Sequence, residues 1–269
     1  MEALRQEVLT SIAAWGAPHA AAGVTGRRDA VHGDAERRFA WASVTKPAVA
    51  VAVLVAVEEG IVDLDEEAGP PGATLRHLLA HASGLPFDEG PPIAAPGRRR
   101  IYSNQGFEVA AALVAERAGI PFAAYFEAVW AGTAIRLEGS PAAGATGSLR
   151  DLLALAAELL APARIAPETL AEAVSVQFPR LDGVLPGFGR QAPNDWGLGF
   201  ELRDGKQPHW TGSLCSPATF GHFGRSGTFL WIDPEAQLAL GCLTDREFGD
   251  WAKAAWPRLS DGVLTAAFS

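Results

Sequence analysis

An almost unbroken apolar run over residues 47–57 constrains the fold of this chain more than any other feature. The run has no polar face and is too short to span a bilayer, so it predicts a helix that is buried on most sides. Lys46, one of only three lysines in the chain, opens this run. A lysine is misplaced there, because burial and the positive end of the helix dipole both lower the pKa of its ammonium group.

Ser43 precedes Lys46 by three residues, which places the two side chains about one helical turn apart. Serine is a favoured N-cap residue, and we expect Ser43 to cap this helix. A lysine of lowered pKa beside a serine hydroxyl also pairs a base with a nucleophile. The Ser-x-x-Lys pattern is short, however, and alone it does not decide between catalysis and coincidence.

A second pattern brings together two rare residues, Tyr102 and Asn104, in a chain that has only two tyrosines and two asparagines. One interpretation is a simple turn, because asparagine favours turns and Pro96 and Gly97 already break the chain. The functional interpretation gives the phenol the task of relaying protons to and from a serine. Asn104 then orients Lys46 and the substrate through hydrogen bonds.

The third pattern is a His-x-Gly sequence at residues 222–224, which has little value as a motif by itself. Its setting carries more information, because two apolar runs, 228–235 and 237–243, follow it and predict two strands joined by a short turn. Glycines at positions 221, 224 and 227 allow a ligand to approach the backbone of an edge strand closely. A backbone N–H at such a place can contribute to an oxyanion hole.

The order Ser-x-x-Lys, Tyr-x-Asn and His-x-Gly resembles the serine β-lactamase and penicillin-binding-protein superfamily, most closely its class C β-lactamase, esterase and D-aminopeptidase branch. Residues 78–86, 196–200 and 228–234 also resemble that branch, and the likeness spans about residues 40–245. The resemblance implies that Ser43 is the nucleophile and that Lys46 and Tyr102 share the work of general base. It further implies the surrounding roles: Asn104 as polar support, His222 and Gly224 as lining of the site, and the N–H groups of Ser43 and Arg225 as the oxyanion hole.

Two residues depart from the β-lactamase pattern. His222 stands where β-lactamases usually carry a lysine, and Phe223 replaces a small hydroxyl residue. A histidine with an ordinary pKa near 6.5 is largely neutral at neutral pH, so it lacks the charge that suits a substrate carboxylate. We therefore expect an uncharged, moderately hydrophobic ester or amide rather than a carboxylate-bearing lactam. Four aromatic residues could extend the apolar surface or belong to the core: Trp196, Phe200, Trp210 and Phe220.

Other site chemistries have weak support. His77 and His81 have the spacing of a zinc-binding helix but lack the glutamate that follows the first histidine, so we interpret them as structural. The chain has no Gly-x-Ser-x-Gly elbow, no P-loop and no dinucleotide fingerprint. Cys215 and Cys242 have no metal-like spacing and are expected to be reduced thiols. We expect neither a metal nor another cofactor.

Composition limits the partners. The net charge of -9 and the pI of about 5.2 argue against nucleic acid, leaving a small-molecule ester or amide as the expected partner. The basic triplet 98–100 is either a solvated loop or a device that attracts an anionic substrate. No signal peptide is visible at the N-terminus, so we expect a cytoplasmic protein without membrane association. The oligomeric state is left open.

The order of the elements predicts an α+β fold of the β-lactamase/transpeptidase type. We expect an opening helix (2–15), strands at 20–25 and up to Trp41, and strands again within 200–243, followed by a closing helix (251–268). Between them the chain is helical, at 75–82, 105–118, 122–130, 149–160 and 167–176, with a loop at 183–194. This pattern predicts one domain, 1–269, with an antiparallel sheet lobe (1–42 and 195–269), an inserted helical lobe (43–194) and a catalytic cleft between them.

These features together predict a serine hydrolase that acts on a small ester or amide through an acyl-enzyme. An acyltransferase of the same fold, a true β-lactamase and a catalytically inactive binding protein are the alternatives.

Overall fold

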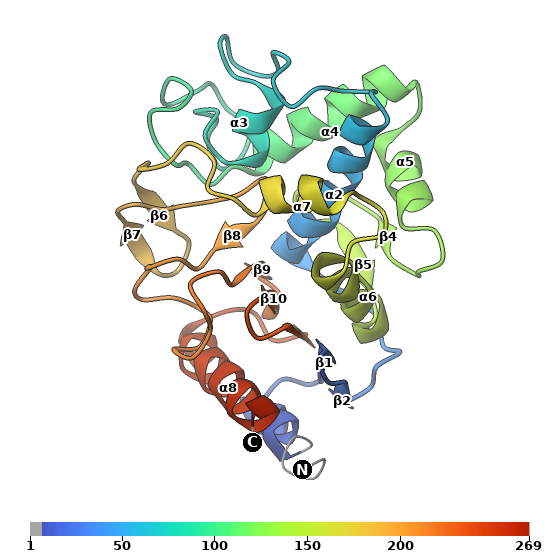
Figure 1. Ribbon diagram of the computed structural model, residues 1–269, viewed down its shortest axis with the longest axis vertical. Coiled ribbons are helices and arrows are strands. Elements are labelled where there is room, and N and C mark those ends of the chain that lie inside the picture. The colour runs from blue at the N-terminus through green and yellow to red at the C-terminus, as the bar shows by residue number, and fades with distance from the viewer. Residues whose placement is uncertain (1–6, 269) are drawn as a thin grey trace.

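The computed structural model describes residues 7–268, and its centre is a sheet made from both ends of the chain (Figure 1). The sheet has six antiparallel strands in the order β2-β1-β11-β10-β9-β8. The strands are β1 (Ala20–Gly26), β2 (Ala30–His32), β8 (Glu201–Leu202), β9 (Phe220–Gly224), β10 (Thr228–Asp233) and β11 (Leu238–Thr244). β1 pairs with β11 along its full length, from Ala20 opposite Thr244 to Gly26 opposite Leu238. The predicted fold class is confirmed.

Both faces of the sheet are buried, and alternate residues of one strand serve different cores. On β10, Phe229 and Trp231 pack into a cluster with the C-terminal helix α8 (Asp250–Phe268) and the 3₁₀ helix η1 (Ser11–Trp15). Leu230 and Ile232 point to the other face, where α6 (Leu149–Leu160) covers the sheet. This alternation is the two-residue period of a strand buried on both sides.

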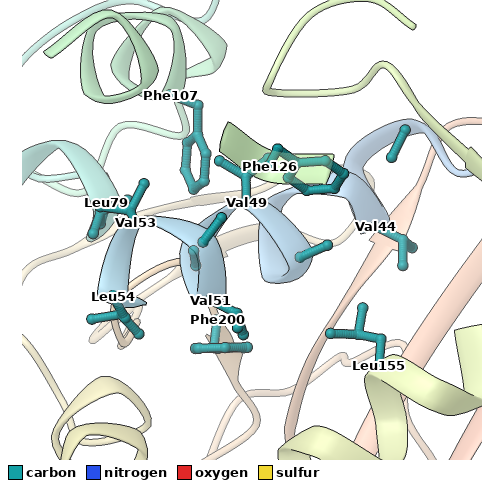
Figure 2. Packing of buried hydrophobic residues seen from close by; sticks show 14 of the residues in the cluster. Val44, Val49, Val51, Val53, Leu54, Leu79, Phe107, Phe126, Leu155 and Phe200 are labelled. Carbon is teal, nitrogen blue, oxygen red and sulfur yellow. The ribbon is translucent and has the colours of Figure 1, made fainter. Parts of the chain in front are cut away.

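The apolar run beyond Lys46 forms α2 (Thr45–Glu58), which lies in the middle of the larger core as predicted. Figure 2 shows Val49, Val51 and Val53 on α2 surrounded by apolar side chains such as Phe107 and Phe126. The surrounding helices are α3 (Leu75–Leu79), α4 (Asn104–Ala118), α5 (Phe122–Val129) and α7 (Pro167–Ala173). A small sheet of β3 (Phe39–Ala40), β5 (Ala145–Gly147) and β4 (Arg136–Leu137) lies beside the start of α2.

The expectation that Ser43 caps α2 is wrong. Ser43 lies in a short 3₁₀ turn, η2 (Ala42–Val44), and the N-cap of α2 is Val44, which makes no side-chain capping bond. Ala42 adopts a positive φ of 46°, a conformation that non-glycine residues rarely adopt. The kink lies just before Ser43, which belongs to the η2 turn and not to the cap of α2.

Several other boundaries differ from the predicted ones. The strand expected to end near Trp41 is divided between β2 and β3, which belong to different sheets. The expected loop 183–194 contains a hairpin of β6 (Gly183–Leu185) and β7 (Gly189–Gln191). α3 stops at Leu79, two residues before His81 takes a positive φ of 56°, and α7 stops at Ala173. Residues 1–6 of the predicted opening helix lie outside the described residues, and residues 7–10 are helical.

Within the described part of the chain, no single helix is long and apolar enough to cross a membrane. Taken together, α4 and α5 are long and apolar enough by length and composition alone. The two helices are bent by 86° relative to each other.

Candidate active site

Ser43 lies in η2, which packs against β9 and leads into α2, the helix that carries Lys46. The Lys46 Nζ atom is 3.5 Å from the Ser43 Oγ atom. Two hydroxyl groups hold the preceding backbone against the sheet: Ser226 donates to the carbonyl of Ala40, and Thr228 donates to the carbonyl of Trp41. The position of the serine is therefore fixed from the sheet side as well as from α2.

Lys46 is fully buried, and its ammonium group is held by neutral acceptors. Nζ lies 2.7 Å from Oδ1 of Asn104 and 2.9 Å from the carbonyl oxygen of Ala142. Burial lowers the pKa of Lys46 from 10.5 to about 7, although the charge of Glu108 opposes this shift. The amine is therefore present in both its protonated and its neutral form near pH 7.

The amide of Asn104 has a defined orientation. Its Nδ2 donates to a carboxylate oxygen of Asp88 at 3.5 Å, so its Oδ1 faces Lys46. The backbone N–H of Asn104 donates to the carbonyl of Phe87 at 2.8 Å, which ties the start of α4 to the loop that carries Asp88. Neither Asp88 nor the Ala142 carbonyl can be found from the sequence, because neither belongs to a recognisable pattern.

Tyr102 lies against Lys46 and two aromatic rings. Lys46 Nζ is 4.7 Å from the centre of the Tyr102 ring, and the rings of His81 and Trp196 lie 4.6 Å and 5.7 Å away. Burial raises the pKa of the Tyr102 phenol, and a hydrogen bond with the Ser43 hydroxyl opposes the rise only in part. Tyr102 is therefore a neutral phenol at neutral pH.

His222 is buried next to the Tyr102 hydroxyl. Its Nδ1 lies 2.7 Å from the backbone carbonyl of Phe223, and its Nε2 lies 3.4 Å from the Tyr102 hydroxyl. Burial and the nearby charge of Lys46 lower the pKa of His222 to about 3, so the imidazole is neutral. The structure thus brings Ser43, Lys46, Tyr102, Asn104 and His222 into one contact network.

The predicted role of Gly224 needs correction. A Cβ atom at this position would come within 2.6 Å of the Trp41 carbonyl oxygen and within 3.0 Å of the Ala42 Cβ atom. The glycine therefore admits the chain segment that precedes Ser43, not a ligand. Its strand, β9, is also not the edge of the sheet, because β8 lies outside it; β8 pairs only with Phe220 and Gly221 and stops before His222.

A cavity of about 230 Å³ opens beside these residues. Ser43, Tyr102, His222 and Arg225 all line it, and the Arg225 side chain points outward, 85% exposed and 3.7 Å from Glu247. The remaining walls are mainly apolar and come from separate segments: Phe87, Leu185, Pro186, Gly187, Trp196, Phe223 and Phe248, with Glu201 among them. Of the four aromatic residues considered from sequence, only Trp196 lines the cavity, whereas Phe200, Trp210 and Phe220 belong to the core.

A second buried lysine, Lys206, lies behind this cavity wall. It pairs with the Glu201 carboxylate and donates to the carbonyls of Asp195 and Leu202, both at 2.6 Å. His209 and Trp210 bind the other carboxylate oxygen of Glu201 at 2.8 Å each. Burial alone would raise the pKa of Glu201, but His209 and Lys206 outweigh it and lower the pKa to about 2.

Other residues singled out in the sequence have structural contacts. His77 forms a capping box with Thr74 at the start of α3, and His81 accepts the backbone N–H of Ser103 at 3.1 Å. In the described part of the chain, no group of three or more histidine, cysteine or acidic residues is placed to hold a metal ion. Arg100 is buried and donates to four backbone carbonyls. Neither Arg100 nor the exposed Arg98 and Arg99 line the cavity.

Known proteins resemble this chain in sequence and in fold. A family model described as Beta-lactamase matches residues 11–133 and 126–263. A comparison with curated proteins gave no match. Among solved structures, a beta-lactamase from Mycobacterium bovis is 52% identical with a TM-score of 0.95, and the match covers 97% of this chain and 99% of that one.

Two more distant structures share the fold. A variant of simvastatin synthase from Aspergillus terreus is 16% identical with a TM-score of 0.80, over 99% of this chain and 94% of that one. A hydrolase with promiscuous acyltransferase activity is 18% identical with a TM-score of 0.76, over 97% of this chain and 98% of that one.

Proposed function

Because this chain belongs to the beta-lactamase family, we propose that it is a serine hydrolase that forms an acyl-enzyme on Ser43 with a small ester or amide. The observation that carries the proposal is the placement of Lys46. A buried amine with a pKa of about 7, held 3.5 Å from a serine hydroxyl, is a base at the place where a nucleophile needs one.

The hydrogen bonds of Lys46 favour its neutral form as the base. A neutral amine has two N–H bonds and one lone pair. Asn104 Oδ1 and the Ala142 carbonyl take the two N–H bonds, which leaves the lone pair for the Ser43 proton. Tyr102 has the opposite character, since its raised pKa keeps the phenol protonated at neutral pH and leaves no phenolate to take a proton. We therefore assign the base to Lys46 and a positioning role to Tyr102.

In the proposed reaction, Ser43 Oγ attacks the substrate carbonyl as its proton moves to Lys46 Nζ. The backbone N–H groups of Ser43 and Arg225, at the edge of the same cavity, stabilise the oxyanion. Lys46 then returns the proton to the leaving alcohol or amine as the bond to it breaks. A water molecule repeats these steps on the acyl-enzyme and releases the acid, with Lys46 again taking and returning one proton.

The cavity favours an uncharged substrate. Its walls are mainly apolar, and the one N–H of neutral His222 is directed at the Phe223 carbonyl. A substrate carboxylate near His222 would therefore meet the Nε2 lone pair instead of a cation. We propose short-chain aryl esters as good substrates and penicillins as poor ones, and we expect His222→Lys to shift the ratio toward lactams.

Two other activities remain candidates. The Mycobacterium bovis relative is described as a beta-lactamase, which favours lactam hydrolysis. The two distant structures are described as a synthase and as a hydrolase with acyltransferase activity, which favours transfer of the acyl group to an alcohol or amine. Product analysis with and without added alcohol separates hydrolysis from transfer.

The test is a panel of p-nitrophenyl esters, D-amino-acid amides and nitrocefin, with the wild-type protein and Ser43→Ala. We expect ester turnover and a fluorophosphonate adduct in the wild type, and neither in Ser43→Ala. Because the Ser43 side chain makes no capping bond, the variant should keep its fold, which circular dichroism can check. An adduct on the alanine variant in intact-mass spectra would refute Ser43 as the nucleophile.

A further inference from the structure

We propose that His222 positions the Tyr102 hydroxyl by accepting a hydrogen bond from it, so that the phenol proton is directed at His222 and not at Ser43. The inference rests on the proposed function, because it assigns a role within the same site. It also gives His222, the first residue of the His-x-Gly pattern, a role other than contact with a substrate carboxylate.

The tautomer of His222 follows from its backbone contact. Nδ1 lies 2.7 Å from the Phe223 carbonyl oxygen, and a carbonyl can only accept a hydrogen bond. Nδ1 therefore carries a proton. The ring is buried and neutral, so it has one N–H only, and Nε2 is left with a lone pair.

That lone pair is directed at Tyr102. The Tyr102 hydroxyl is 3.4 Å from Nε2, and since Nε2 has no proton to give, the hydroxyl must be the donor. The Tyr102 ring lies between His81, at 4.6 Å, and Lys46 Nζ, at 4.7 Å. The ring is thus fixed by its neighbours, and the direction of the O–H bond is what His222 determines.

The contacts form one directed chain of hydrogen bonds. Tyr102 donates to His222, and His222 donates to the Phe223 carbonyl. A chain that ends on a carbonyl cannot reverse, so the Tyr102 oxygen presents only lone pairs to the cavity that Ser43 also lines. Tyr102 therefore neither donates to Ser43 nor takes its proton, which stays available to Lys46.

The first test reads the tautomer directly and needs no substrate. Long-range ¹H–¹⁵N correlation spectra of protein with labelled histidine, at pH 8, distinguish Nδ1–H from Nε2–H rings. The His222 signal is identified by its loss in His222→Gln. We expect a neutral ring with its proton on Nδ1. A proton on Nε2, or a doubly protonated ring, would overturn the proposal even if the protein hydrolyses esters.

The second test is a double-mutant cycle with single-turnover acylation by a p-nitrophenyl ester. His222→Asn has a shorter side chain that can still reach the Phe223 carbonyl but not Tyr102, and we expect acylation to slow about tenfold, the effect of one hydrogen bond. His222→Gln reaches to the depth of Nε2 with an acceptor oxygen, and it should restore the rate to within about threefold of the wild type.

The decisive comparison is made in a Tyr102→Phe background. Without the phenol hydroxyl, His222→Asn should change the acylation rate by less than about twofold, because the two residues act through one bond. An equal slowing in both backgrounds would show that His222 acts independently of Tyr102. If the wild type acylates no ester at all, the proposed function fails, and the histidine spectra still decide the hydrogen-bond direction.

Discussion

The regions around Lys46 and Lys206 bury the same side chain in opposite ways. Lys46 donates to an amide oxygen and a backbone carbonyl and lies near a serine. Lys206 donates to two backbone carbonyls and to the Glu201 carboxylate. Both are nearly inaccessible to water, and burial lowers the pKa of both, but only Lys206 has a carboxylate bound directly to its nitrogen.

The difference shows what separates a base from a structural ion pair. The Glu201 carboxylate binds the Lys206 ammonium group and favours its charged form. The ion pair with Glu201 therefore requires Lys206 to keep its proton. Neutral acceptors bind the protons of Lys46 without holding a positive charge as strongly. Burial itself therefore does not make a lysine reactive; the acceptors around its nitrogen do.

The largest expected effect comes from replacing Lys46 with arginine. Arginine stays charged at all accessible pH values, so Lys46→Arg should lower the acylation rate by about 10²–10⁴-fold. The exposed third lysine is the matched control, because Lys253→Arg keeps its surface contact with Asp250 and should leave the rate unchanged. Near-normal acylation by Lys46→Arg would mean that the comparison is wrong and that Lys46 is a fixed charge.

The free energy of unfolding should respond in the reverse order, with a larger loss at Lys206 than at Lys46. Lys206→Met leaves the buried Glu201 carboxylate without its ammonium partner and should cost about 3–5 kcal/mol of unfolding free energy. Lys46→Met removes a buried cation and leaves only two neutral acceptors unpaired, so it should cost less. Urea denaturation at pH 7 measures both. Equal losses would contradict the idea that only one of the two lysines is a structural ion.

The sequence revealed some of this arrangement and could not reveal the rest. The long apolar runs predicted α2, β10 and β11 correctly, because buried elements leave continuous hydrophobic patterns. The hairpin β6–β7 was missed, since its short strands lie among glycines and prolines and have no alternating pattern. Three separate segments supplied Lys46, Asn104 and His222 to the predicted site.

The sequence gives no signal for a contact made by the backbone or for the segment that packs against a glycine. The Ala142 carbonyl that binds Lys46 belongs to a backbone, which any residue could supply. Gly224 was expected to admit a ligand, but the space it leaves is filled by the chain before Ser43. Such roles depend on which segments meet, and one chain read in order carries no signal for them.

The pH dependence gives a third test. The proposed base must be neutral, so kcat/KM for an ester should fall about tenfold for each pH unit below about 7 and level off above it. Unfolding restores the Lys46 pKa to 10.5, so between pH 7 and 10.5 the unfolded chain binds one more proton than the folded one. The unfolding free energy should therefore rise with pH, by up to about 1.4 kcal/mol per unit.

This stability slope is measured as the difference between the wild type and Lys46→Met from pH 7 to 8.5, because titrating groups that both proteins share cancel in the difference. A difference that stays constant across that window would mean that the folded-state pKa of Lys46 is not lowered.

The smallest effect concerns the support of the two sites. Asp88 orients the Asn104 amide through an exposed hydrogen bond of 3.5 Å, so Asp88→Ala should slow acylation by about two- to fivefold. Its exposed neighbour offers the control, Glu89→Ala, which should have no effect. On the Lys206 side, Thr211→Val removes the hydroxyl that contacts His209 Nδ1 and should leave acylation unchanged. If Thr211→Val slows the reaction as much as Asp88→Ala, the two regions are not functionally separate.

The pairing of β1 with β11 also determines when the main sheet can form during synthesis. When β1 leaves the ribosome, the strand that will pair with it at Ala20 and Thr244 has not been translated. Such long-range pairing must close a very large loop, which makes folding slow compared with that of locally connected chains. The nascent chain can form α2 and its neighbouring helices early, but β9 and β11 arrive late. The cavity beside Ser43 therefore cannot form until the chain has been synthesised through β11 and Phe248, which lines the cavity.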